Sequence, residues 1–260
     1  MSQSNPTNES RKSVIASELA WHEQEAHRRI SLDTFLYDPP AFDAVVGDGF
    51  AFLRTPPGDV ALEMGCGEGK ETLQLAERGL LVISTDLSYA QLSRTRERLR
   101  QWAPDAPVFF VQANAEESPF AARSFGSIYG KAIIHHLDID MAAEEIKRLL
   151  KPGGRATFAE PMAGHPLFML GRWLTPQWRT RDEHPLTFSE LRQFGDHFSR
   201  VEIREYFLLA PLGYVFRLLP GGESLFRRFH ARLQRVDRRL FGTFAALREW
   251  AWYSLINVDR

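Results

Sequence analysis

The chain has 260 residues and a formal net charge of −1 at pH 7, and 44% of its residues are hydrophobic. A chain of this length can form one sizeable domain or two small ones. The near-neutral charge argues against a protein that works mainly by coating nucleic acid, because such domains carry a strong basic excess. We therefore expect a small-molecule partner and no nucleic acid.

Cysteine usage and hydropathy indicate the compartment. Cys66 is the single cysteine, which excludes an internal disulfide and is typical of a reducing environment. The first residues lack the apolar core of a secretion signal, and no stretch has the roughly eighteen uncharged apolar residues of a membrane span. We expect a cytoplasmic protein.

The N-terminal part of the chain is expected to be helical. Apolar positions recur among polar ones from residue 13 to about residue 29, and a second helical stretch covers residues 32–53. The Asp-Pro-Pro sequence at residues 38–40 interrupts this second stretch, because proline cannot continue a helix from upstream. We predict that residues 1–53 form a helical lid segment.

After this segment the chain alternates short apolar runs with helical stretches. Strands at 60–64, 80–85, 108–113, 126–133 and 155–160 are predicted, with helices near 70–78, 89–101 and 140–150 between them. Strands that alternate with helices of this length pair in parallel through right-handed crossovers. The pattern predicts a doubly wound α/β sheet.

The regular alternation of predicted strands and helices ends after residue 160. A proline-bearing stretch leads to a predicted helix at 187–197, a strand at 200–207, an arginine-rich helical region at about 212–248 and a last strand at 251–259. Aromatic side chains interleave with these arginines. One interpretation is a basic amphipathic surface that makes a peripheral membrane contact or meets a lipid-like substrate. In the other, the aromatic side chains pack on the core and the arginines form the wet face.

The sequence VALEMGCGEGKETLQLA, at residues 60–76, places three alternating glycines between a predicted strand and a predicted helix. A Walker phosphate loop requires Ser or Thr after its lysine, whereas Glu71 stands there. A dinucleotide fingerprint requires its third glycine one residue beyond Gly69. Glu63, Glu68 and Glu71 surround the turn, so a pyrophosphate is disfavoured and a ligand with ammonium and sulfonium groups is favoured.

The motif LEMGCGEG resembles the first motif of class I S-adenosylmethionine-dependent methyltransferases, in which glycines alternate after an acidic and an apolar residue. VISTDLS, VQANAEESPF and SFGSIYGKAIIHHL are similar to the next three motifs of that family, in the same order. RLLKPGGRATFAEP resembles the helix, turn and fifth strand that follow. The likeness covers about residues 58–161.

This resemblance implies S-adenosylmethionine as the cofactor and implies which residues hold it. The Asp86 carboxylate would accept hydrogen bonds from both ribose hydroxyls. Asn114 stands where the family usually has aspartate, and its amide oxygen can still accept from the adenine amine. Gly130 and Lys131 would lie against the methionine part. The predicted cofactor-binding set is Glu63, Gly65, Cys66, Gly67, Gly69, Asp86, Leu87, Asn114, Ala115, Gly130 and Lys131.

Two histidines and one glutamate are the candidates for catalysis. His135 and His136 follow the fourth predicted strand, where a histidine can deprotonate an acceptor hydroxyl or amine; the alternative is a structural, cofactor-flanking pair. His136 is preferred, because alternation with Ile134 and Leu137 directs one histidine toward the cleft. Glu160 ends the fifth strand and can act as a base, orient a substrate cation or cap the next element.

The consecutive residues Asp182, Glu183 and His184 have side chains of the metal-ligand type. Consecutive side chains in an extended loop point in opposite directions, so these three are poorly placed to share one ion. We predict no metal site and a solvated charged loop.

As the resemblance implies, we predict a single-domain Rossmann-like methyltransferase fold with a mainly parallel sheet of about seven strands, the last antiparallel. The methyltransferase domain covers residues 54–260, with lid insertions at about 161–199 and 208–248. The expected function is methyl transfer from S-adenosylmethionine to an oxygen, nitrogen or carbon atom of a small, largely apolar organic acceptor in secondary or lipid/quinone-type metabolism. The alternatives are a non-methylating reaction such as cyclisation, or a non-catalytic binding protein. The oligomeric state stays open.

Overall fold

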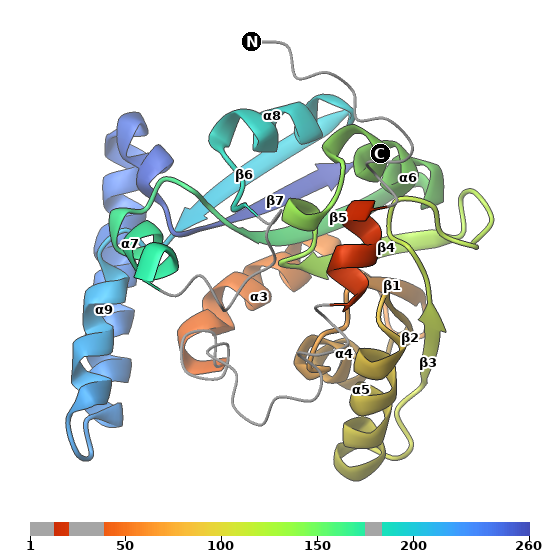
Figure 1. Cartoon of the computed structure of the whole chain (residues 1–260), viewed down its shortest axis with the longest axis horizontal. Coiled ribbons are helices and arrows are strands. Elements are labelled where there is room, and N and C mark those ends of the chain that lie inside the picture. Colours follow the sequence, from red (N-terminus) through yellow and green to blue (C-terminus); the bar gives the residue numbers. More distant parts are fainter. Residues whose placement is uncertain (1–12, 21–38, 175–183) are drawn as a thin grey trace.

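The computed structural model describes residues 13–20, 39–174 and 184–260. Seven strands form one sheet in the order β3-β2-β1-β4-β5-β7-β6 (Figure 1). They are Val60–Met64 (β1), Leu81–Asp86 (β2), Val108–Gln112 (β3), Phe125–Lys131 (β4), Leu150–Pro161 (β5), Arg200–Tyr206 (β6) and Tyr253–Asp259 (β7). β1 to β5 pair in parallel, and β7 is antiparallel to β5 and β6. The predicted fold class is confirmed.

Helices cover both faces of the sheet. The α-helices are Pro39–Leu53 (α3), Lys70–Glu77 (α4), Tyr89–Trp102 (α5), Ile139–Leu149 (α6), Pro166–Leu174 (α7), Phe188–Asp196 (α8) and Glu223–Thr243 (α9). The 3-10 helices are Ile134–His136 (η1), Ala210–Leu218 (η3) and Ala245–Trp250 (η4). Figure 1 shows α3, α4 and α5 on one side of the sheet and α6 and α8 on the other. Residues 13–20 form another helical segment.

The order of the strands reverses at β1. From β1 the chain builds outward to β2 and β3, and it then returns to pair β4 with the other edge of β1. Met64 at the end of β1 is in register with Thr85 of β2 and Gly130 of β4. Open α/β sheets bind ligands at the carboxyl ends of the strands where the order reverses. The glycine turn that follows Met64 lies at this point.

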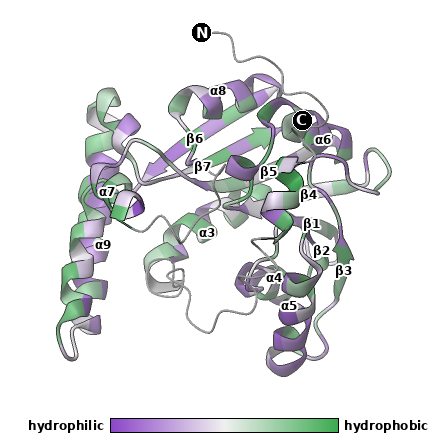
Figure 2. Cartoon of the chain, in the orientation of Figure 1, coloured by the Kyte–Doolittle hydropathy of each residue, from purple (hydrophilic) through white to green (hydrophobic). Residues whose placement is uncertain are grey.

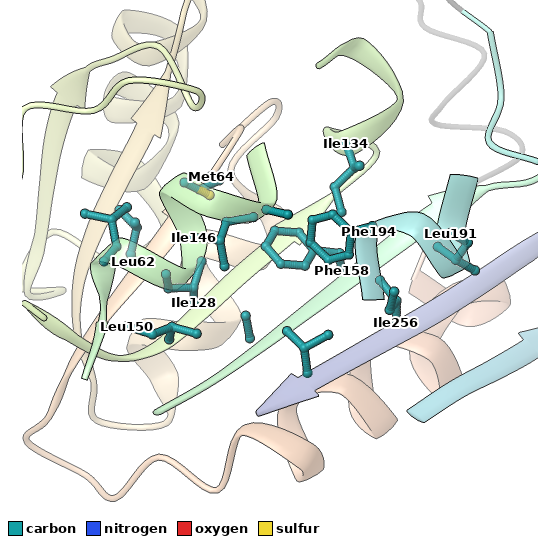
Figure 3. Close-up of a cluster of buried hydrophobic side chains, with 14 of the residues drawn as sticks. Leu62, Met64, Ile128, Ile134, Ile146, Leu150, Phe158, Leu191, Phe194 and Ile256 are labelled. Carbon is teal, nitrogen blue, oxygen red and sulfur yellow. The ribbon is translucent and has the colours of Figure 1, made fainter. Parts of the chain in front are cut away.

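One hydrophobic cluster joins the sheet to α6 and α8 (Figure 3). Ile146 of α6 and Leu191 and Phe194 of α8 are fully buried against strand residues such as Phe158. The rings of Phe158 and Phe194 meet edge-on with their centroids 5.6 Å apart. Because α8 contributes to the core, the predicted lid insertion at 161–199 is wrong for this helix, which belongs to the layer that covers the sheet.

The opposite face of the sheet is covered by α3. Val46, Phe50 and Leu53 recur at helical spacing and pack against Ala61 of β1 and Val82 of β2. The prediction of a lid over residues 1–53 is therefore wrong for Pro39–Leu53. This helix begins at a proline, where the missing N–H costs no hydrogen bond. Residues 21–38, which were also assigned to the lid, lie outside the described residues.

The insertion between β6 and β7 forms a helical hairpin of η3 and α9 at one side of the sheet (Figure 1). Asp237 of α9 is 1% exposed, and its carboxyl oxygens accept from the backbone N–H groups of residues 208–210 at 2.9 to 3.0 Å. These donors lie at the N-terminal end of η3, where backbone N–H groups lack partners within the helix. Asp237 therefore attaches the two arms of the hairpin to each other. In the part of the chain that the structure describes, no helix is both long enough and apolar enough to cross a membrane.

We expect Asp237→Ala to lower the free energy of unfolding by about 3 kcal/mol, because it leaves buried backbone donors without an acceptor. Asp237→Asn keeps one oxygen as an acceptor, so its loss should be smaller. The exposed Arg235→Ala on the same helix is the control and should stay within about 0.5 kcal/mol of the wild type. Urea denaturation of the four proteins measures these differences. A value for Asp237→Ala equal to that for Arg235→Ala would contradict the anchoring role.

Candidate functional site

The glycines of the turn after β1 have three different reasons to be glycine. Gly65, Gly67 and Gly69 all have positive φ, at 74°, 46° and 79°. A Cβ at Gly69 would lie 2.5 Å from Thr95 Cγ2, so this residue allows α4 to pack against α5. A Cβ at Gly65 would press on Ile133, whereas one at Gly67 would meet no atom within 4 Å. Gly67 therefore faces open space at the carboxyl edge of the sheet.

Asp86, at the end of β2, lies directly beside this turn. Its Oδ2 accepts from the Gly67 N–H at 3.3 Å and lies 3.7 Å from Cys66 Sγ, while Oδ1 accepts from the Ser88 N–H at 2.9 Å. Burial raises the pKa of the Cys66 thiol well above its ordinary value, so the sulfur is a neutral neighbour. Leu87 follows and is half-buried. The carboxylate thus connects the ends of two adjacent strands.

Glu63, in β1, is buried beneath the turn. Its side chain is 1% exposed, and its Oε2 accepts from Thr72 Oγ1 at 2.6 Å and Ser84 Oγ at 2.7 Å. Burial raises the pKa of Glu63 to about 8, although the two hydroxyl donors oppose this shift. The group is therefore mostly protonated at neutral pH, and it attaches β1 to α4 and β2.

The acidic character that we predicted for the turn is largely compensated. The Glu68 carboxylate lies 3.2 Å from Lys70 Nζ and 3.8 Å from an Arg98 nitrogen. Glu71 accepts from Lys131 Nζ at 2.6 Å. The net negative charge that we inferred for the turn is therefore wrong, because Lys70 lies beside Glu68 and because the sequence does not show that α5 and β4 bring Arg98 and Lys131 to the turn. Asp86 differs from these acids, because its carboxylate accepts a hydrogen bond from a backbone N–H of the turn itself, that of Gly67.

The ends of β3 and β4 place the other predicted cofactor residues. Asn114 follows β3, and its Oδ1 accepts from the Glu116 N–H at 3.1 Å, while Ala115 packs against the core. A Cβ at Gly130 would lie 2.7 Å from the Phe158 ring. Packing therefore accounts for this glycine, in addition to any role of its backbone at the cofactor edge.

Glu160 and His135 form a buried pair behind η1. Glu160 has no exposed surface; its Oε1 accepts from the Ile133 and Ile134 N–H groups at 2.9 Å each, and its Oε2 lies 2.8 Å from His135 Nδ1. These contacts give Glu160 a role outside the three that we considered, because its oxygens hold the turn after β4 and not the element that follows Glu160 in the chain. His135 is 6% exposed and shares this positioning role.

His136 has a different neighbour. Its Nδ1 lies 2.9 Å from Oε2 of Glu18, which is 5% exposed and belongs to the helical segment 13–20. The His135 and His136 rings stack with centroids 4.1 Å apart. The sequence does not single out Glu18, because it lies in a polar segment with no motif and only the tertiary fold brings it to η1.

The predicted cofactor residues and both histidines thus come from the loops and strand ends of β1 to β4, at one edge of the sheet. Over residues 13–20, 39–174 and 184–260, His, Cys, Asp and Glu side chains form no group of three or more that is suited to a metal ion. Asp182 and Glu183 lie outside the described residues. His184 lies 3.1 Å from Glu190, which caps α8.

Comparisons with known proteins agree with this geometry. Residues 62–158 match the model of a methyltransferase domain. The chain is 33% identical over 132 residues to methyltransferase GfsG of Streptomyces halstedii, which covers 47% of this chain and 48% of that protein. It is 33% identical over 134 residues to a 2-phytyl-1,4-naphtoquinone methyltransferase of Thermosynechococcus vestitus, covering 49% and 58%. The chain spans about half the length of the curated relatives it matches.

A solved structure shows the same fold. Geranyl diphosphate C-methyltransferase from Streptomyces coelicolor superimposes with a TM-score of 0.59 at 20% identity, over 84% of this chain and 79% of that chain. The segment that matches the family model contains the glycine turn, Asp86 and the two histidines. Over residues 62–158 the chain thus resembles a methyltransferase domain, and its fold is that of the solved methyltransferase structure.

Proposed function

We propose that this protein transfers a methyl group from S-adenosylmethionine to a small, largely apolar organic acceptor. One observation carries the proposal: the left-handed glycine turn and the Asp86 carboxylate lie together where the strand order reverses. The names of the relatives include a phytyl naphthoquinone methyltransferase and a geranyl diphosphate C-methyltransferase, which supports an apolar acceptor. The oxygen, nitrogen or carbon atom that receives the methyl group stays undetermined.

The residues at the carboxyl edge of the sheet fit this cofactor. Open space in front of Gly67 admits a ligand close to the backbone, and Asp86 offers a carboxylate beside it for ribose hydroxyls. We assign the adenine end to Leu87, Asn114 and Ala115. The cofactor, when bound, supplies an electrophilic methyl group on a sulfonium.

His136 is our candidate for the base that accepts a proton from the acceptor. Methylation of a hydroxyl or amine breaks the bond from the methyl group to sulfur, forms one to oxygen or nitrogen, and leaves a proton that a base must take. Nδ1 of His136 lies 2.9 Å from Glu18 Oε2, without the alignment of a hydrogen bond, and we assign Nε2 as the nitrogen that takes the proton. Glu18 is then a positioning residue that places its carboxyl group beside the ring.

We also propose that the helical segment 13–20 is part of a lid. Glu18 brings this segment onto η1, which directly follows the strand end that carries Lys131 and belongs to the cofactor edge. A lid at this position would exclude water and hold the acceptor in line with the methyl group. The lid role predicted for residues 1–53 is thereby limited to the residues before α3.

The cofactor assignment is tested by thermal unfolding with S-adenosylhomocysteine and, separately, with NAD. At about 100 times its Kd a ligand stabilises the native state by about 2.7 kcal/mol, so S-adenosylhomocysteine should raise the melting temperature by several degrees and NAD should not. Asp86→Ala should abolish this increase. Asp105→Ala, an exposed aspartate between α5 and β3, is the control and should retain it. An increase with NAD alone would overturn the assignment.

The catalytic assignment is tested with His136→Ala on an acceptor found by mass spectrometry among phenolic, quinone and prenyl compounds. A methyltransferase releases S-adenosylhomocysteine and a product heavier by one CH2, whereas a cyclising enzyme gives neither. For a hydroxyl or amine acceptor, kcat should fall by about 10²-fold, because general base catalysis typically contributes this much or more. The response of the melting temperature to S-adenosylhomocysteine should not change.

The exposed His184→Ala is the control for this loss. Glu18→Gln should lower kcat less than His136→Ala does. It should also move the acid limb of the pH–rate profile toward lower pH, because a neutral amide no longer stabilises the imidazolium. If turnover in His136→Ala equals that in His184→Ala, His136 is not the base. If the acid limb in Glu18→Gln is unmoved, Glu18 has no positioning role.

A further inference from the structure

The 3-10 arm of the helical hairpin carries a row of apolar side chains on its outside. Leu212, Val215 and Leu218 recur every three residues, a spacing that places them on one face of a 3-10 helix. They are 51%, 57% and 75% exposed. Exposed apolar side chains are ordinary when scattered singly, whereas a contiguous group marks an interaction site.

This row continues onto the turn and the start of α9. Leu219, Leu225 and Phe229 are also exposed, and the Phe229 ring lies 5.0 Å from that of Phe216 on the other arm. We define the hairpin tip as the five side chains Val215, Leu218, Leu219, Leu225 and Phe229. Figure 1 shows α9 at the left side of the molecule, away from α4 and α5.

Arginines surround the apolar stripe on α9. Leu225, Phe229 and Val236 lie on one side of the helix with Arg232 among them, and other arginines lie beside this row, as the alternating colours of Figure 2 indicate. These exposed arginines are Arg227, Arg228, Arg232, Arg235, Arg238 and Arg239.

Few carboxylates offset this positive charge. Among the described residues, Arg227 is the member of this group that lies within ion-pair distance of a carboxylate, at 3.0 Å from Glu223. Asp237, the other acid of α9, is buried and accepts from residues 208–210. The exposed surface of α9 is therefore strongly positive, although the whole chain is close to neutral.

We propose that the hairpin tip docks on the surface of a membrane that contains anionic lipids. The apolar side chains of the tip would enter the boundary between headgroups and acyl chains, and arginines such as Arg228 and Arg232 would contact lipid phosphates. An interfacial helix combines these features: an apolar stripe, a basic polar face and low net hydrophobicity. The proposal rests on the surface of the hairpin and does not depend on the proposed function.

The positive charge of α9, together with the exposed apolar side chains, favours an anionic lipid surface over a second copy of the chain or a nucleic acid. In a symmetric contact between two copies, each unpaired arginine surface would face an identical one, and like charges disfavour that arrangement. The phosphate backbone of a nucleic acid would complement the arginines, but it gives the exposed leucines no apolar environment. An anionic bilayer satisfies both parts of the surface.

Sedimentation with vesicles tests the proposal on the full chain. We expect binding to vesicles of phosphatidylcholine with phosphatidylglycerol, weaker binding to phosphatidylcholine alone, and a loss of affinity as salt is raised. Each arginine near an anionic surface contributes about 1 kcal/mol, or about fivefold in affinity, so Arg228→Glu with Arg232→Glu should weaken binding by about 25-fold or more. Leu218→Asp with Leu225→Asp should abolish it.

Matched controls come from α5, where Trp102 and Arg96 are also exposed. Trp102→Asp and Arg96→Glu change the same kinds of side chain and should leave vesicle binding unaltered. The melting temperature and its increase with S-adenosylhomocysteine report whether each variant is folded. If Leu218→Asp with Leu225→Asp is not folded, Leu218→Ser with Leu225→Ser is used in its place. Failure of the docking proposal thereby stays distinguishable from failure of the cofactor assignment.

Three results of the vesicle experiment would overturn docking on anionic membranes. These are no binding to either kind of vesicle, equal binding to both kinds, or equal losses in the hairpin and α5 variants. A dimer in the absence of vesicles that the hairpin variants dissociate would also overturn it, because the tip would then be an interface between copies.

Discussion

The geometry of the proposed catalytic edge depends on one buried carboxyl group. Glu160, at the end of β5, accepts from two successive N–H groups in the turn after β4 and also contacts His135. A buried polar group is tolerated when its hydrogen bonds are satisfied, and here the partners also fix the backbone of the turn. His136 is the next residue, so the position of its ring follows from this contact. The pairing of His136 with Glu18 then brings residues 13–20 to the same place.

The cofactor edge uses a second buried acid in a related way. Glu63 lies beneath the glycine turn, and the hydroxyl groups of Thr72 and Ser84 attach it to the neighbouring elements. Because burial makes the protonated form dominant, this residue contributes more to the position of the turn than to its charge. Asp86 lies at the same edge, and its carboxylate accepts a hydrogen bond from the Gly67 N–H of the turn. The turn is thus held from below by Glu63 and from its side by Asp86, the carboxylate that we propose as the ligand for ribose hydroxyls.

Local sequence pattern was sufficient to predict the strands, whereas the antiparallel direction of the last strand followed from the family resemblance. The apolar runs at β1, β2 and β3 are flanked by glycine, proline or helical stretches, and each predicted strand lies within a few residues of the observed one. The glycine turn and Asp86 could be placed at one edge of the sheet because they adjoin strand ends, which local pattern locates well. α3 and α8 were assigned to lids because periodicity shows that a helix has an apolar side and not what covers it. The sequence did not reveal Glu18, because this residue lies far from His136 along the chain. It also did not reveal that Arg98 and Lys131 pair with Glu68 and Glu71, because these basic residues lie on other elements.

The same device recurs at the hairpin between β6 and β7. Asp237 holds the N–H groups at the start of η3, as Glu160 holds those at the start of η1. In both places an acid on another element satisfies the first donors of a 3-10 helix, which has few internal hydrogen bonds of its own. Leu212, Val215 and Leu218 on the outside of η3 keep half or more of their surface exposed. Burial in the core therefore accounts for only part of their apolar character, and the proposed contact with an external surface accounts for the rest.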